Sequence, residues 1–190
     1  MNEVQRLNDF NRIAPALITE NTTMIDWLAD HGFFSAPAST KWHGAFSGGL
    51  YDHSKAVFDA LTFLTERLNL TWQRPESPFI IGMFHDLCKV DQYREVVDEP
   101  GKVMFGEFEP KGREVHYEWA DPFVKGHGDK SVMYLSHLMR LTEEEMFCIR
   151  YHMGAFEKDD IEGYSKAVEK FNNVLFAHTA DMMASKIQGV

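Results

Sequence analysis

Apolar residues recur at three- and four-residue steps over residues 50–68, a spacing that predicts an amphipathic helix with one inward face. His53 lies on that inward face. A nearly continuous apolar run predicts a second, buried helix over residues 77–89, and this run contains the pair His85-Asp86. Burial of an ionisable side chain is costly unless the group is paired or bound to a metal. Both predicted helices therefore carry polar groups that need a partner.

The same spacing, together with capping residues, predicts the remaining helices. They are expected over residues 3–19 with a bend at Pro15, over 22–31 with Thr22 or Thr23 as the cap, over 129–140, over 142–152 behind a Thr142–Glu145 capping box, and over 164–187 with a break near 172–173. Residues 33–49 contain Pro, Ser and Gly and predict an ordered loop.

Residues 95–120 differ, because Val, Phe and Tyr alternate there with charged residues between turn signals. That alternation is typical of strands and predicts a small β-hairpin or β-sheet insertion. The expected fold is therefore mainly α, with about six or seven helices and one β insertion. We expect a single domain over residues 1–190, with N-terminal helices and a loop over 1–45 and the core over 46–190.

Composition narrows the functional classes. The chain has 190 residues and a net charge of −10, which disfavours binding of extended nucleic acid through its phosphates without a partner protein. No apolar stretch is long enough for a membrane span, and the first residues lack a signal-peptide pattern. Two cysteines are too few for a disulfide framework, so a cytoplasmic location is the simplest expectation. The nine histidines are the unusual feature.

Six ionisable residues lie next to buried positions on five predicted elements, with His85 and Asp86 on the same one. They are His53, His85, Asp86, His127, His152 and Asp181. Four imidazoles and two carboxylates that converge in a helical core form a metal site, and this nitrogen and oxygen donor set suits iron, manganese, zinc or nickel better than calcium.

The order of these residues resembles that of the HD-domain metal-dependent phosphohydrolases. "GGLYDHS" is similar to the Gly-Gly-Leu-x-x-His-Ser segment of the family, and "HTADMMAS" to its closing Ala-Asp segment. "FHDLCK" resembles the His-Asp-x-x-Lys of HD-GYP phosphodiesterases, although a Gly-Tyr-Pro element is absent. The run from His43 to Leu50 is similar to one in the HD domain of bacterial 3′-to-5′ exoribonucleases. The resemblance covers about residues 43–186 and implies an HD-domain helical bundle.

The resemblance also implies the roles of the six residues. His53, His85, Asp86 and Asp181 would bind metal, and His127 and His152 match the two histidines that bind a second ion in some subfamilies. Asp86 would then bridge two divalent ions, with iron or manganese expected and zinc, nickel or magnesium as alternatives. A metal-bound hydroxide would attack the phosphate ester of a nucleotide or a similar small substrate, with Asp86 and Lys89 as catalytic residues.

Several assignments have plain structural alternatives. His152 also fits a helix-terminal histidine, His127 a loop histidine, and Lys89 a solvated lysine at a helix end. His43 and Arg94 are candidates for substrate binding, but His43 fits equally well as a packed side chain and Arg94 as half of a surface ion pair. His178, one turn before Asp181, fits either a hydrogen-bond partner of a ligand or a core residue.

Two other functions fit the same residues. A minority of HD-fold proteins with four histidines and two aspartates are di-iron oxygenases, and a third possibility is a nucleotide-binding module without turnover. The β insertion carries aromatic residues close in sequence to the His-Asp pair, and we expect it to wall the opening and help choose the substrate. These residues are Tyr93, Phe105, Phe108, Tyr117 and Trp119.

Overall fold

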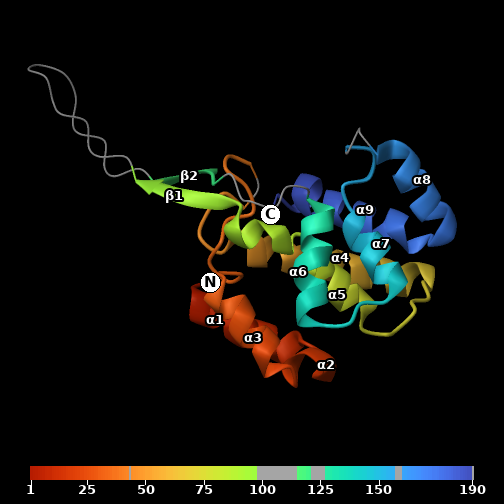
Figure 1. The fold of residues 1–190 in the computed structure, drawn as a ribbon, viewed down its shortest axis with the longest axis horizontal. Helices are drawn as coiled ribbons and strands as arrows, with labels where there is room; N and C mark the ends of the chain where they lie inside the picture. The colour runs from red at the N-terminus through yellow and green to blue at the C-terminus, as the bar shows by residue number, and fades with distance from the viewer. Residues whose placement is uncertain (43, 98–114, 121–126, 157–159, 190) are drawn as a thin grey trace, which may run out of the picture.

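The computed structural model describes residues 1–42, 44–97, 115–120, 127–156 and 160–189, and within them it is mainly helical with one small antiparallel sheet (Figure 1). The α-helices are α1 (Glu3–Ile13), α2 (Ala16–Thr19), α3 (Thr22–Asp30), α4 (Gly49–Leu68), α5 (Ser77–Phe84), α6 (Gly128–Leu138), α7 (Glu143–Arg150), α8 (Ile161–Lys170) and α9 (Asn173–Met182). Two short 3₁₀ helices, η1 (Leu87–Asp91) and η2 (Gly154–Phe156), and a π-helix, η4 (Met183–Gln188), complete the helical part. The expected helical bundle with a small β-hairpin is confirmed.

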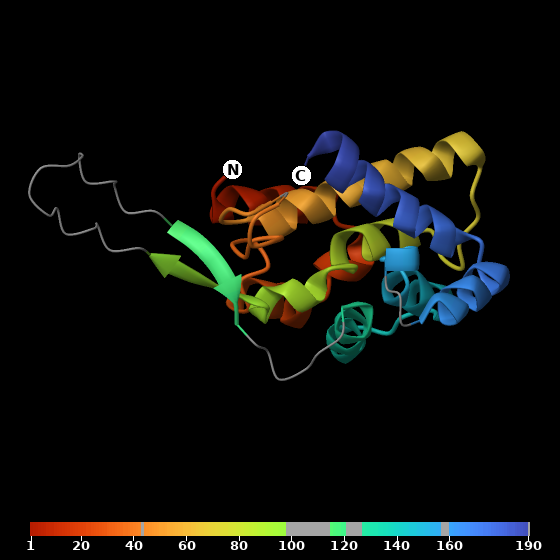
Figure 2. The same cartoon turned by 90° about the horizontal axis from the view of Figure 1, so that it is seen from above.

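The sheet is the insertion that the sequence predicts after the His-Asp pair. Strand β1 (Tyr93–Val97) pairs with β2 (Val115–Trp119), and Tyr93 lies opposite Trp119. In Figure 2 this hairpin projects from one end of the helical bundle. Phe105 and Phe108 lie outside the described residues. None of the described helices combines the length and the apolar character needed to cross a lipid bilayer.

The N-terminal helices differ in detail from expectation. The predicted helix over 3–19 is broken at Pro15, because α1 ends at Ile13 and α2 begins after the proline. The cap of α3 is Asn21 and not Thr22 or Thr23, because the Asn21 side chain accepts a hydrogen bond from the Met24 amide at 3.1 Å. Near the C-terminus the expected break is present between α8 and α9, whereas the π-helix that follows was not predicted.

The buried helix over 77–89 is shorter than the apolar run suggests. Helix α5 ends at Phe84, and Asp86 leaves the helical region with φ −103° and ψ 19°. The Lys89 amide then donates to the Asp86 carbonyl at 2.9 Å, which begins η1. Apolar periodicity reports burial and not helix termination, so this break could not be read from the pattern. The break places His85 and Asp86 on a corner of the backbone.

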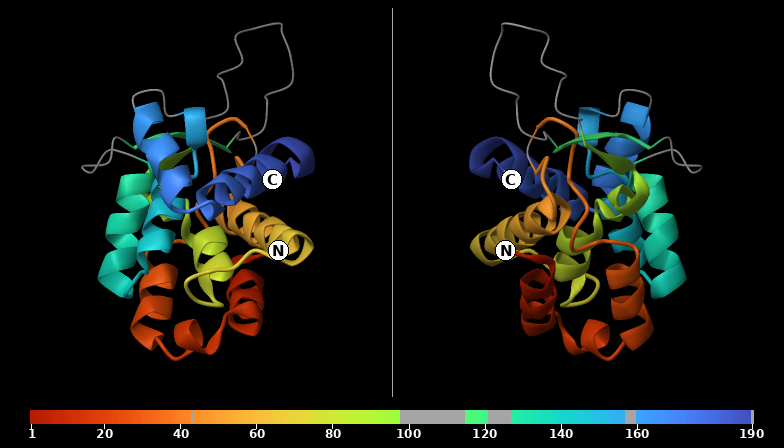
Figure 3. Two further views of the ribbon diagram at one scale, coloured as in Figure 1. Left: turned by 90° about the vertical axis from the view of Figure 1, so that its right-hand side faces the viewer. Right: turned by 90° about the vertical axis from the view of Figure 1, so that its left-hand side faces the viewer.

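One hydrophobic core includes the N-terminal helices. The Phe10 ring contacts the rings of Phe34 and Phe84, with centroids 5.6 Å and 6.2 Å away, respectively. Arg6 of α1 makes a bidentate ion pair with Asp52 of α4 at 2.9 and 2.8 Å. Figure 3 shows α1 and α3 along one side of the bundle, close to α4 and α5. Residues of the 1–45 segment therefore contribute to the core that supports the end of α5.

Helices α5, α7 and α9 begin at a polar cluster around Glu144 and Glu145, and their other ends lead to the predicted ligand residues. Ser77, the first residue of α5, donates to Glu145 of α7 at 2.8 Å, and Asn173, the first residue of α9, donates to Glu144 at 2.8 Å. His85, His152 and Asp181 follow seven or eight residues after Ser77, Glu145 and Asn173. The polar cluster therefore sets the three helices in register, about 12 Å from the site at a rise of 1.5 Å per residue.

Close contact between α4 and α5 depends on Gly82. A Cβ atom at this position would lie 2.4 Å from Cα of Phe58, a backbone atom that cannot move without shifting α4. We expect Gly82→Ala to destabilise the fold by about 1–3 kcal/mol, because overpacking exceeds the gain in helix propensity. Urea denaturation measures this change. Met83→Leu, a volume-conserving change at the next buried position, should cost less; equal stability of Gly82→Ala and the wild type would contradict the packing argument.

Candidate metal centre

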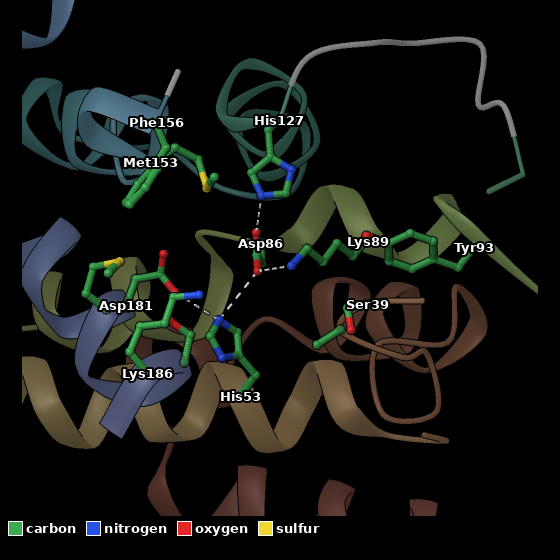
Figure 4. Close-up of a pocket in the computed structure, with 13 residues that line it drawn as sticks. Ser39, His53, Asp86, Lys89, Tyr93, His127, Met153, Phe156, Asp181 and Lys186 are labelled. Atoms are coloured by element: carbon green, nitrogen blue, oxygen red, sulfur yellow. Dashed lines mark ion pairs between the residues drawn. The ribbon is translucent and has the colours of Figure 1, made fainter. Parts of the chain in front are cut away.

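The six predicted ligand residues meet at one point of the fold. His53 comes from α4, His85 and Asp86 from the corner after α5, His127 from the start of α6, His152 from the turn after α7, and Asp181 from α9. Figure 4 shows Asp86 in the centre, with His127 on one side and His53 on the other. His53, His85 and His152 are at most 1% exposed, and Asp86 is 2% exposed. The predicted convergence is therefore present.

Asp86 is shared by two groups of side chains, each able to hold one ion. His53, His85 and Asp86 form one group, and Asp86, His127 and His152 form the other. Oδ2 of Asp86 lies 3.5 Å from Nε2 of His53 and 3.4 Å from Nε2 of His85. Oδ1 lies 2.6 Å from Nε2 of His127 and 3.5 Å from Nε2 of His152. One carboxylate oxygen thus faces each group, which is the arrangement of a bridging ligand.

Asp181 extends the first group. Its Oδ1 lies 3.2 Å from Nε2 of His53, and its carboxylate lines the same pocket. Burial raises the pKa of Asp181, but the hydrogen bond from His53 and the charge of His85 outweigh burial and lower this pKa below its ordinary value. Asp181 is therefore an anionic oxygen donor.

The outer ring nitrogens of two histidines are held by backbone carbonyls. Nδ1 of His85 donates to the Gly82 carbonyl at 2.9 Å, and Nδ1 of His152 donates to the Ile149 carbonyl at 2.7 Å. In the neutral rings these bonds leave the lone pair on Nε2, which faces the site. Nε2 of His85 lies only 3.3 Å from Nε2 of His53. Such an approach is favourable when a cation is shared between the two nitrogens.

The charges around Asp86 favour the ionised form of its carboxylate. Burial alone raises the pKa of Asp86, but the charge of Lys89, together with His85 and His127, holds that pKa well below its usual range. Burial lowers the pKa of His85 and of His127. Burial also lowers the pKa of His152, but its contact with Asp86 outweighs this effect and raises the pKa. Burial raises the pKa of the Cys88 thiol to about 12, and Cys88 belongs to neither group of candidate ligands.

These residues fit a transition metal. Within the described part of the chain, Oδ1 of Asp86 and Nε2 of His152 are buried without a well-directed hydrogen bond, although Oδ1 lies 2.6 Å from Nε2 of His127. A buried polar atom without a hydrogen bond is costly, and a metal ion would satisfy both atoms. The donors are imidazole nitrogens and carboxylate oxygens, a set that suits zinc, iron, manganese or nickel. The buried His/Asp groups can therefore hold metal, and their donor types leave the identity of the ion open.

Lys89 lies against the same carboxylate. Its Nζ is 2.6 Å from Oδ2 of Asp86, and the side chain is largely buried at the wall of the pocket. Burial lowers the pKa of Lys89, but the charge of Asp86 outweighs burial and raises it, so the ammonium is charged. The alternative of a solvated lysine at a helix end is therefore wrong. The pocket has a volume of about 300 Å³, which suits a small ligand.

Of the other residues predicted to border the pocket, Tyr93 lines it and Arg94 does not. Arg94 is on β1, pairs with Glu118 at 3.0 Å and does not line the pocket. Its position matches the surface ion-pair alternative. Tyr93 lines the pocket and contacts the Trp119 ring, with centroids 6.0 Å apart, so the base of the hairpin borders the opening. His43 lies outside the described residues, and its suggested role stays a prediction.

Sequence reasoning missed part of the pocket wall. Ser39, Met153, Phe156, Met182, Ser185 and Lys186 also line it. Ser39 and Phe156 lie in a loop and a short 3₁₀ turn, where no periodic signal marks the direction of a side chain. Lys186 follows Asp181 by five residues, and on an α-helix side chains at this spacing lie on different faces. Only the π-helix changes that relation.

His178 supports the metal centre from behind. Its Nδ1 donates to the backbone carbonyl of His152 at 2.7 Å. Gly154 has φ +57° and leaves room for the ring, since a Cβ there would lie 2.8 Å from it. Of the two alternatives for His178, the structure therefore favours a hydrogen-bond partner of a ligand residue, and the bond is to the His152 backbone.

We expect His178→Ala to weaken metal binding at the Asp86–His127–His152 group by up to about tenfold, the lower end of the effect of an outer partner, because His178 holds the His152 backbone and not its ring. Competition of the metal-loaded protein with a chelator measures the affinity. His178→Asn retains an N–H donor and should restore most of it, whereas His137→Ala on α6 serves as a control. Unchanged affinity in His178→Ala would show that the His152 backbone needs no such support.

Comparisons with protein-family models, with curated proteins and with solved structures found no match. The likeness to HD domains therefore depends on the quoted motifs and on the arrangement of the side chains. A helical bundle with a buried His/Asp cluster is compatible with that likeness.

Proposed function

We propose that this protein hydrolyses a phosphate ester of a small, nucleotide-like substrate with the help of two bound divalent metal ions. The observation that carries the proposal is the position of Asp86. One of its carboxylate oxygens faces each histidine group, and the Lys89 ammonium lies 2.6 Å from Oδ2 beside the pocket. A site with two anchored cations and a nearby ammonium suits a doubly charged phosphoryl group. When bound, the ions supply Lewis acidity and lower the pKa of a water molecule.

The side chains of the protein have separate tasks in this proposal. Asp86 and the four histidines would hold the two cations, and backbone carbonyls fix the rings of His85 and His152 for this task. Lys89 has three N–H donors and uses one toward Asp86, so that donors remain for a phosphoryl oxygen. Lys89 is buried at the pocket wall, and a lower local dielectric strengthens its attraction to a phosphate.

The small size of the pocket and the acidic chain favour a small substrate over a long single strand. Tyr93 at one end and Phe156 at another offer aromatic faces for the organic part of the substrate. These contacts support the expectation that the base of the hairpin takes part in substrate choice.

Hydrolysis is tested with protein loaded anaerobically with manganese or iron. Bis-p-nitrophenyl phosphate and a panel of nucleotides are the substrates, and release of nitrophenol or phosphate is the readout. We expect cleavage that depends on the added metal and disappears with a chelator. Absence of ester cleavage with every metal, together with oxygen consumption on a polyol or phosphonate, would replace hydrolysis by the oxygenase alternative. Nucleotide binding without either reaction would favour the binding module.

A further inference from the structure

A second lysine, far from Lys89 in the sequence, also borders the pocket. Lys186 lines the pocket and comes from the π-helix after α9. In Figure 4, Lys89 and Lys186 approach from opposite sides of Asp86, with Asp181 beside Lys186. The pocket therefore carries one ammonium that is engaged with Asp86 and a second one at its other side.

Lys186 differs from most described lysines in having no carboxylate partner. Five lysines pair with an acidic side chain, and they are Lys55, Lys89, Lys130, Lys166 and Lys170. Lys186 makes no ion pair with any residue of the described ranges, although Asp181 lies close by in sequence and the chain has a net charge of −10. An exposed ammonium at the edge of the pocket is thus available to a ligand.

The local backbone explains why Lys186 reaches the pocket. Residues 183–188 form a π-helix, whose i to i+5 hydrogen bonds bring residues five apart nearer to the same face. This wider turn lies between Asp181, near the end of α9, and Lys186, and both residues line one pocket together with the half-buried Ser185. π-Helices are rare and often occur at functional sites, where they redirect a side chain.

We propose that Lys186 binds a second anionic group of the substrate, so that the preferred substrates carry two phosphoryl groups a short distance apart. This inference builds on the proposed function, because Lys89 and the metal positions take the group to be cleaved. Lys186 then acts as a specificity residue and does not touch the reacting atoms. A substrate with one phosphoryl group leaves Lys186 in water and gains nothing from it.

Binding of phosphonates tests this role without any hydrolysis. Manganese-loaded protein is titrated anaerobically in a calorimeter with methylphosphonate and with methylene-, ethylene- and propylenediphosphonate. We expect at least one diphosphonate to bind the wild type about tenfold or more tightly than methylphosphonate, equivalent to about 1.4 kcal/mol. In Lys186→Ala this preference should fall to about threefold or less, while methylphosphonate affinity stays within about twofold of the wild type.

Two further variants complete the test. Lys186→Arg keeps the charge and should keep the preference, and Lys166→Ala removes an exposed lysine of α8 and should behave as the wild type. The inference is overturned if Lys186→Ala binds every diphosphonate as the wild type does, or if the wild type shows no preference. If the wild type cleaves no ester but Lys186→Ala still loses the preference for diphosphonates, the inference is upheld and the proposed hydrolysis is refuted. Unchanged melting temperatures exclude a folding defect.

Discussion

Asp86→Asn is expected to prevent binding of both proposed metal ions and to abolish the proposed hydrolysis. The substitution keeps the shape of the side chain but takes away the charge that faces His53 and His85 on one side and His127 and His152 on the other. Because Asp86 belongs to both groups, its loss weakens both metal positions at once. We expect a fall in rate of about 10³-fold or more, equivalent to about 4 kcal/mol of transition-state stabilisation.

Elemental analysis of the purified protein, with a rate assay on the same samples, measures both effects. Two equivalents of metal in the wild type and less than one in Asp86→Asn are expected. Asp59→Asn makes the same change in charge on α4, at an exposed position paired with Lys55, and should retain both ions. If Asp86→Asn kept two equivalents and the full rate, Asp86 would not bridge the ions. One equivalent in the wild type would restrict the centre to one group.

Glu145→Ala is expected to have the largest effect on stability. Glu145 is fully buried and accepts hydrogen bonds from Arg74 at 2.7 Å, from Ser77 at 2.8 Å and from the Thr142 amide at 2.9 Å. Alanine would leave these donors without their partner, and removal of one member of a buried ion pair costs about 3–5 kcal/mol. Arg74 is partly exposed, so we expect about 3 kcal/mol and a fall in melting temperature of roughly 6–12 °C.

Denaturation in urea, with a chelator present, measures this change without a contribution from bound metal. Glu143→Ala is the matched control, because Glu143 lies two residues earlier on the same helix and makes an exposed ion pair with Lys170; we expect a change below about 0.5 kcal/mol. In a double-mutant cycle, Glu145→Ala with Arg74→Ala should cost less than the sum of the single changes. Strict additivity would mean that the pair contributes no coupling.

Loss of the Glu145 hydrogen bonds is also expected to affect the candidate metal centre. Glu145 connects the start of α7 to the start of α5, and these helices deliver His152 and His85 at their other ends. The two rings are in contact, with centroids 4.8 Å apart. We therefore expect any Glu145 variant that still folds to hold its metal less tightly, although Glu145 lies far along the helices from the pocket.

The fold class and the convergence of the site could be predicted from the sequence because their signals are local. Helical spacing marks the buried faces of α4 and α5, and Thr142 with Glu145 forms the capping box that opens α7. A charged or polar side chain on a buried face requires a partner, so His53, His85 and Asp181 pointed to one another before any contact was known. Turn residues likewise marked the hairpin.

Other features depend on contacts between residues that lie far apart in the chain. The split of the two Asp86 oxygens follows from the end of α5 at Phe84, which the apolar run gives no reason to expect. Arg94 lies on a strand that directs it toward Glu118, and the π-helix brings Lys186 to the pocket. The periodicity of apolar residues predicts whether a residue is buried, and the residue type determines its chemistry. The direction of a side chain depends instead on where helices end and how they pack. For this protein the sequence alone determined which buried ionisable side chains need a partner. The tertiary structure decided that two groups of histidines share the Asp86 carboxylate as that partner.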